Sequence, residues 1–208
     1  MNHQKLSNVA IWETADKYLR KIVEPHLYGD FILPFTVLRR IECVLEKTKP
    51  QLLEYMSSLA ADEVKQEVRD KDASALVPLT EKSLAKLDGF ARHGLQLPFY
   101  NTSVHSLARM AETNAITYEA MEEYIGAFST DIADVWENFD FMKKVQVLSQ
   151  EDLLVTMVKH FAKVDLSPER LDEYSMGNLF EDLMYRSFSQ KGSAAGAFYT
   201  CLLYTSDA

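Results

Sequence analysis

Residues 29–47, GDFILPFTVLRRIECVLEK, decide the fold. Their apolar side chains recur at intervals of three and four, which is the spacing of one face of an α-helix. We expect Asp30 to cap this helix and Pro34 to lie in its first turn, where a missing N–H breaks no hydrogen bond. Four charged residues fall largely off the expected face: Arg39, Arg40, Glu42 and Glu46. The predicted buried stripe consists of Leu33, Val37, Leu38, Ile41 and Leu45.

Helical spacing continues along most of the chain, and no internal repeat interrupts it. Helices are predicted within residues 7–23, 49–74 (followed there by a charged stretch), 76–94, 117–129, 129–148, 151–164, 166–175 and 175–191. The expected helix starts are Ser7, Ser149 with Asp152, and Ser167 with Pro168 at the first helical position. We expect one helix to close near Gly94, and a break near Asn138.

Apolar sets define the expected core of the second half. These are Met121, Tyr124, Ile125 and Phe128; Leu153, Leu154, Met157, Val158 and Phe161; and Leu179, Phe180, Leu183, Met184 and Phe188. Residues 95–103 are the one stretch where a brief extended segment is expected, and Pro98 limits it to an edge or a loop. Charged residues 61–79 are the best candidate for a linker.

Composition favours a mainly α fold. The 208 residues are 47% hydrophobic, with only 7 glycines and 6 prolines, so a buried core is expected and a turn-rich β fold is not. Two cysteines, Cys43 and Cys201, do not make a disulfide framework. We find no apolar run of membrane-spanning length and no secretory signal pattern, so we expect a cytoplasmic protein without membrane contact.

The net charge of −9 argues against a domain that grips nucleic acid by itself, since phosphate binding depends on Lys and Arg. Only two modest basic groups are candidates for such binding: Lys17 with Arg20 and Lys21, and Arg39 with Arg40. An acidic domain joined to a basic partner remains compatible with this charge.

The usual catalytic and metal-binding patterns are missing from the sequence. The five histidines have no metal-ligand spacing, and His160, next to apolar neighbours, is interpreted as structural. There is no G-x-S-x-G, Walker or G-x-G-x-x-G motif, so no catalytic residue and no metal site is predicted. Carboxylate pairs such as Glu122 with Glu123 are typical of solvated helix faces.

One short stretch, residues 196–200 (GAFYT), has the chemistry of a ligand loop. Gly196 permits close approach of the backbone, and successive N–H groups with the Thr200 hydroxyl can bind a carboxylate or phosphate. Phe198 and Tyr199 can wall a flat ligand. By itself the pattern is equally that of a small-residue loop after a helix.

Three stretches in order resemble one known family, the methyltransferase (modification) subunit of Type I restriction-modification systems. Residues 31–46, FILPFTVLRRIECVLE, are similar to the family's N-terminal "ILPFTVLRRLDCVLE" helix. Residues 176–183, MGNLFEDL, are similar to its "MGxxFExL" helix. Residues 196–200 resemble the start of its "G-x-(F/H)-(Y/F)-T-P-R" loop, although Cys201 and Leu202 stand where Pro-Arg would follow.

The resemblance implies a DNA adenine-N6 methyltransferase that uses S-adenosylmethionine, with a helical domain before a Rossmann-like catalytic domain. It places Ala197, Phe198, Tyr199 and Thr200 at the cofactor. Expected partners are DNA, the specificity subunit, the restriction subunit and a second methyltransferase subunit. The expected layout is a helical domain at 1–190, the start of the cofactor loop at 191–200, and a non-native tail at 201–208.

The N-P-P-(F/Y) motif that holds the flipped adenine in this family is absent, because none of the six prolines has a proline neighbour. The glycine-rich cofactor loop is absent too. We therefore expect an N-terminal fragment of the enzyme subunit, truncated before its catalytic domain and inactive alone. Two alternatives remain: a non-enzymatic helical interaction module, and a helical domain that binds DNA by itself.

Overall fold

The computed structural model describes residue 11, residues 17–70 and residues 79–190, and these residues are all-helical, without a strand. This confirms the mainly α prediction. The expected Ser7 cap lies outside the described residues. The α-helices of the described residues are α2 (Tyr28–Leu45), α3 (Lys49–Asp70), α4 (Glu81–Gly89), α5 (Leu107–Thr113), α6 (Tyr118–Gly126), α7 (Ala133–Asn138), α8 (Phe141–Gln150), α9 (Leu154–Phe161) and α10 (Glu173–Gln190).

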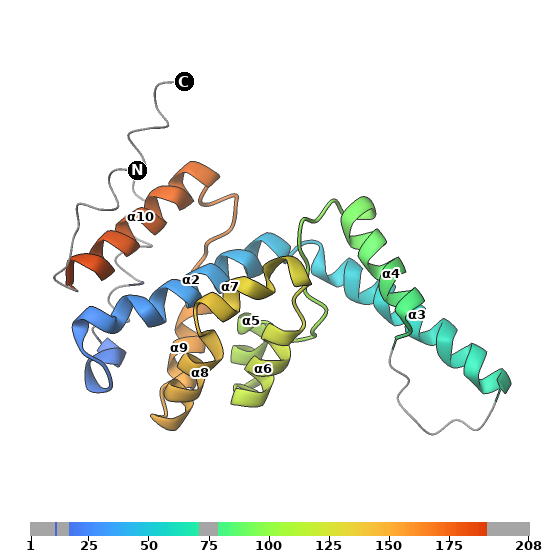
Figure 1. Ribbon diagram of the computed structural model, residues 1–208, viewed down its shortest axis with the longest axis horizontal. Coiled ribbons are helices and arrows are strands. Elements are labelled where there is room, and N and C mark those ends of the chain that lie inside the picture. The colour runs from blue at the N-terminus through green and yellow to red at the C-terminus, as the bar shows by residue number, and fades with distance from the viewer. Residues whose placement is uncertain (1–10, 12–16, 71–78, 191–208) are drawn as a thin grey trace.

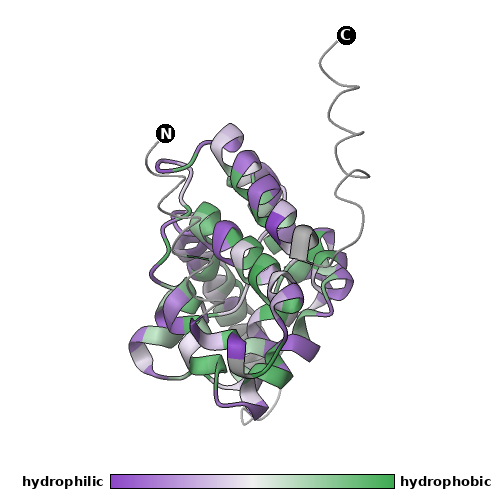
Figure 2. Cartoon of the chain, turned by 90° about the vertical axis from the view of Figure 1, so that its left-hand side faces the viewer, coloured by the Kyte–Doolittle hydropathy of each residue, from purple (hydrophilic) through white to green (hydrophobic). Residues whose placement is uncertain are grey.

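Helix α2 runs through the middle of the molecule, between α10 on one side and the shorter helices α5 to α9 on the other (Figure 1). Phe35 of α2 is fully buried, and its ring packs edge-on against Phe141 of α8 and stacks on Phe161 of α9, with centroids 5.1 and 5.3 Å apart. Hydrophilic and hydrophobic residues alternate around the individual helices, as amphipathic packing requires (Figure 2). The main core therefore forms around α2.

The details of α2 differ from the sequence prediction in two ways. The helix begins at Tyr28, directly after a 3₁₀ turn at Pro25–Leu27 and without a side-chain cap, so Pro34 lies inside the helix rather than in its first turn. Only Leu38 and Leu45 of the predicted stripe are buried, while Leu33, Val37 and Ile41 are half-buried. The predicted stripe of buried residues was wrong because other helices cover α2 on more than one side.

Helices α3 and α4 pack together as an arm with a small core of its own, made by Leu52, Leu59, Leu87 and Ala91 (Figure 1). The α3 helix continues to Asp70, so the first half of the predicted linker at 61–79 is helical. The predicted closure near Gly94 is confirmed by a π-helical turn at Phe90–Gly94. At this turn, Arg92 donates to Asp88 at 2.9 Å and to Asp131 at 2.6 Å, which ties the arm to the body.

The predictions made for residues 95–148 are confirmed, but the helix α5 at Leu107–Thr113 was not predicted. Asn101 forms an isolated antiparallel bridge with Phe128, which is the expected brief extended segment. The apolar set of Met121, Tyr124, Ile125 and Phe128 is buried. The chain breaks after Asn138, where α7 ends, and Asp140 adopts a φ of 47° before α8 begins.

Two predicted helix starts were wrong. Ser149 lies inside α8, and Asp152, with a φ of 56°, sits in the turn before α9 begins at Leu154. Ser167 opens only a turn, in which its carbonyl accepts from the N–H groups of Arg170 and Leu171. The next helix, α10, begins at Glu173. The Asp172 carboxylate provides its cap, because it accepts a hydrogen bond from the Ser175 N–H at 2.8 Å.

The apolar faces of α9 and α10 largely follow the prediction. Leu154, Met157, Val158, Phe161, Leu179 and Leu183 are buried, while Leu153, Phe180 and Met184 are half-buried. The Phe188 side chain lies outside the described residues. Helix α10 crosses α2 so closely that a Cβ on Gly29 would lie 2.0 Å from the Ser187 Oγ and 2.3 Å from the Ser187 Cβ. A glycine is therefore required at this crossing.

We expect Gly29→Ala to lower the free energy of unfolding by about 1–3 kcal/mol, because the added methyl group overpacks the α2–α10 contact. Urea unfolding followed by far-UV circular dichroism measures this change. Gly89→Ala is the matched control, since no atom lies within 4 Å of a Cβ there. The Ser187→Gly change should partly rescue Gly29→Ala; equal losses in the presence and absence of Ser187→Gly would contradict the assigned contact.

Candidate functional site

The predicted cofactor residues Ala197, Phe198, Tyr199 and Thr200 lie outside the described residues, as do the predicted segments 191–200 and 201–208. The structure therefore leaves the predicted S-adenosylmethionine loop untested. It describes instead how the other two family-like stretches, on α2 and α10, are used. The polar residues of α2 prove to be the most informative.

Glu42 is buried, with 8% of its surface exposed, although its position in the sequence predicted a solvated residue. Its carboxylate accepts hydrogen bonds from the backbone N–H groups of Leu107 and Ala108, at 3.1 and 3.2 Å. These are the first N–H groups of α5, which have no partner inside that helix. Arg39 pairs with the same carboxylate at 3.1 Å. Glu42 thus joins α2 to the N-terminus of α5.

Burial raises the pKa of Glu42, and the Arg39 guanidinium with the two N–H groups opposes that effect. Each hydrogen-bond partner of this carboxylate is an N–H group that donates to it, and such an arrangement favours the ionised form of the carboxyl group. The sequence did not reveal this role, because a Glu among arginines on a helix has the pattern of a solvated face. Only the contact with α5, 65 residues further along the chain, identifies it.

The neighbouring arginines point inward as well. Arg39 Nε donates to the Val164 carbonyl at 2.8 Å, and Arg40 Nη1 donates to the carbonyls of Leu166 and Leu171 at 2.6 and 2.9 Å. Both side chains are half-buried. They hold the segment that leads from α9 to α10, so they do not form the exposed basic patch considered for DNA binding.

Lys49 completes this polar centre at the start of α3. Its ammonium donates to Asn101 Oδ1 at 3.0 Å and to the His105 carbonyl at 2.5 Å, and it lies 4.8 Å from the centroid of the Tyr124 ring. Burial lowers the pKa of Lys49 to about 8, while the negative charge of Glu42 acts in the opposite direction. Lys49 therefore ties the arm to the loop before α5.

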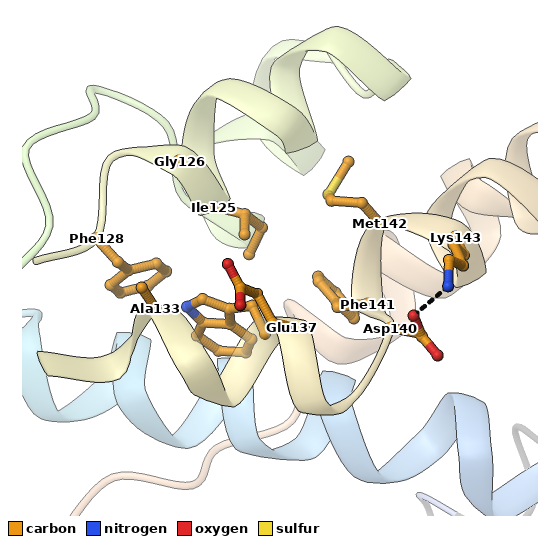
Figure 3. Close-up of a pocket in the computed structure, with 10 residues that line it drawn as sticks. Ile125, Gly126, Phe128, Ala133, Glu137, Asp140, Phe141, Met142 and Lys143 are labelled. Carbon is orange, nitrogen blue, oxygen red and sulfur yellow. Dashed lines mark hydrogen bonds and ion pairs between the residues drawn. The ribbon is translucent and has the colours of Figure 1, made fainter. Parts of the chain in front are cut away.

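One cavity of about 410 Å³ opens between α6, α7 and α8 (Figure 3). Aromatic rings line it, with Phe128 5.2 Å and Phe141 5.7 Å from the Trp136 ring. Glu137 and an Asp140–Lys143 ion pair also line it. The sequence pattern placed Phe128 in the expected core and predicted no cavity.

The described residues form no cluster of three or more His, Cys, Asp or Glu side chains that could hold a metal ion. Within the same ranges, no helix is both long and apolar enough to cross a bilayer. His160 lies edge-on to Phe161, with ring centroids 5.7 Å apart, which fits its predicted structural role.

The described residues form an all-α domain organised around one central helix. Residues 8–161 match the protein-family description "HsdM N-terminal domain", which covers well over half of the chain. The chain belongs to this family, the N-terminal region of the methyltransferase subunit of Type I restriction-modification systems. The enzymes of this family are DNA methyltransferases that use S-adenosylmethionine. No curated protein and no solved structure gave a significant match.

We expect the Lys49 ammonium to titrate near pH 8 instead of near its ordinary 10.5. Because the pKa in the folded state is the lower one, burial of the ammonium destabilises the fold fully below pH 8, and this cost falls as the pH rises toward 10.5. Carbon-detected NMR of the lysine Cε resonances measures this titration.

Glu42→Gln should move the Lys49 titration to still lower pH, because it removes the nearby negative charge and keeps an acceptor oxygen. Glu46→Gln is the matched control on the exposed side of α2. A Lys49 midpoint at 10 or above, or an equal response to both variants, would show that the ammonium does not belong to the buried centre.

Proposed function

We propose that this chain is the N-terminal helical part of a subunit that transfers a methyl group from S-adenosylmethionine to the N6 atom of adenine in DNA. The family match over residues 8–161 is the observation that carries this proposal. The MGNLFEDL stretch of α10 adds to it, because it lies beyond the matched region and still has the pattern expected from the resemblance.

In this proposal, the helical domain at 1–190 sets the direction in which the chain enters the cofactor site. Helix α10 is anchored on α2 through Leu179, Leu183 and the Gly29 crossing. Residues 191–200 would follow directly from that anchored helix. Ala197, Phe198, Tyr199 and Thr200 would then meet S-adenosylmethionine, and residues 201–208 would be a non-native tail.

The chemistry requires the target adenine to leave the base stack, so that its N6 atom can attack the methyl group of the sulfonium. Such a reaction depends mainly on the positioning of the two reactants. The 208 residues contain no N-P-P motif for the flipped base, so the adenine pocket would be supplied by another part of the subunit. A rigid helical domain would then contribute orientation.

The charge distribution favours contacts with proteins over direct contacts with DNA. The chain carries a net charge of −9, and Arg39 and Arg40 are used inside the fold. We propose that the domain contacts the specificity subunit and, in the full complex, the restriction subunit and a second methyltransferase subunit. It would help to enclose DNA together with those partners.

The test compares this 208-residue chain with a complete methyltransferase subunit that contains residues 1–200, each with its specificity subunit, on unmethylated DNA and methyl-labelled S-adenosylmethionine. We expect label on N6-methyladenine only from the complete assembly, because residues 1–208 lack the base-binding motif. Chromatography of the digested nucleosides identifies the product.

A complete subunit carrying Gly29→Ala should bind the specificity subunit or transfer methyl groups more weakly than one carrying the control Gly89→Ala.

Label on N6-methyladenine from the 208-residue chain alone would overturn the fragment interpretation. An assembly that binds but never labels adenine would favour the alternative, a non-enzymatic interaction module.

A further inference from the structure

We infer that the cavity between α6, α7 and α8 binds a short peptide segment, in which an apolar side chain is flanked by basic residues. The cavity's volume, about 410 Å³, falls at the lower end of the range of roughly 300–1,000 Å³ that is typical of ligand pockets. This inference goes beyond the proposed methyl-transfer chemistry and does not depend on it.

A buried hydrogen-bond donor beside the cavity lacks a partner. Trp136 lines the cavity and is 5% exposed, and its Nε1–H has no hydrogen-bond partner among the described residues. Buried polar groups in folded proteins nearly always have partners, so a donor without one beside a cavity points to an absent acceptor. A backbone carbonyl is the commonest acceptor that a peptide could bring.

The lining is aromatic and aliphatic. Phe128, Trp136 and Phe141 line the cavity with their rings, and Ile125 and Met142 line it as well. Figure 3 shows Ile125, Phe128, Phe141 and Met142 around it. Methionine and aromatic residues adapt to apolar partners and are enriched at the centres of protein interfaces. An aliphatic side chain therefore suits this lining.

Charge at the cavity favours a basic segment. Glu137 lines the cavity, is exposed, and forms no ion pair with any described residue. Asp140 is neutralised by Lys143, so the lining keeps one unbalanced negative charge. Electrostatic complementarity therefore selects a basic segment.

The probes are three blocked tripeptides: acetyl-Lys-Leu-Lys-amide, acetyl-Glu-Leu-Glu-amide and acetyl-Lys-Gly-Lys-amide. The readout is the indole N–H resonance of Trp136 in the ¹⁵N-labelled chain. Because the chain contains two tryptophans, the Trp12→Phe variant identifies which resonance belongs to Trp136. We expect Lys-Leu-Lys to move this resonance downfield in a saturable way, with a dissociation constant of about 1 mM. The other two peptides should bind several-fold more weakly.

Gly126→Leu should abolish the response, because it places a side chain at the cavity where nothing lies within 4 Å of a Cβ. Gly89→Leu is the matched control, since Gly89 also ends a helix and has the same free space. Glu137→Gln, an exposed substitution, should keep the fold and reduce the preference for Lys-Leu-Lys over Glu-Leu-Glu.

The inference is overturned if Lys-Leu-Lys leaves the Trp136 resonance unmoved. It is also overturned if Gly126→Leu binds as well as Gly89→Leu, or if the basic and acidic peptides bind equally.

Discussion

A buried carboxylate holds this fold together. Glu42 satisfies the first N–H groups of α5, pairs with Arg39, and lies close enough to Lys49 to influence its pKa. The two N–H bonds join α2 to α5, Arg39 extends the connection to the Val164 carbonyl before α10, and the charge of Glu42 acts on Lys49 at the start of the arm. A charge removed from water in this way is tolerated only when every one of its oxygens has partners. Each connected element therefore depends on the position of α2.

The arrangement gives both the apolar and the charged residues of the stretch 31–46 a structural role. Its apolar residues pack against α8, α9 and α10, while its polar residues fix the connections between helices. Substitution of either the apolar or the polar residues of α2 would alter the path of the chain from α2 to α10. That path is what the proposed function requires, because α10 leads toward the predicted cofactor loop.

Periodicity predicted α6 to α10 and most of their buried residues, because each of these helices buries one face. It did not predict α5 at Leu107–Thr113, and the helix expected from Ser167 is only a turn. It failed for α2, where several sides are covered and Glu42 is turned inward. It also failed at Ser149, which lies inside α8 instead of starting α9. Long-range polar contacts and competition between nearby caps cannot be read from spacing alone. The cavity beside Trp136 was missed for a related reason: an aromatic residue at helical spacing has the same pattern in a core and at its edge.

The most direct test of the central role of α2 is the unfolding free energy of Glu42→Ala, measured in urea against Glu46→Ala on the exposed side of the same helix. Removing one partner of a buried ion pair leaves Arg39 and two backbone N–H groups unsatisfied, so we expect a loss of about 3–5 kcal/mol for Glu42→Ala. The control should change stability by no more than about 0.5 kcal/mol. Equal and small effects of the two substitutions would contradict the account.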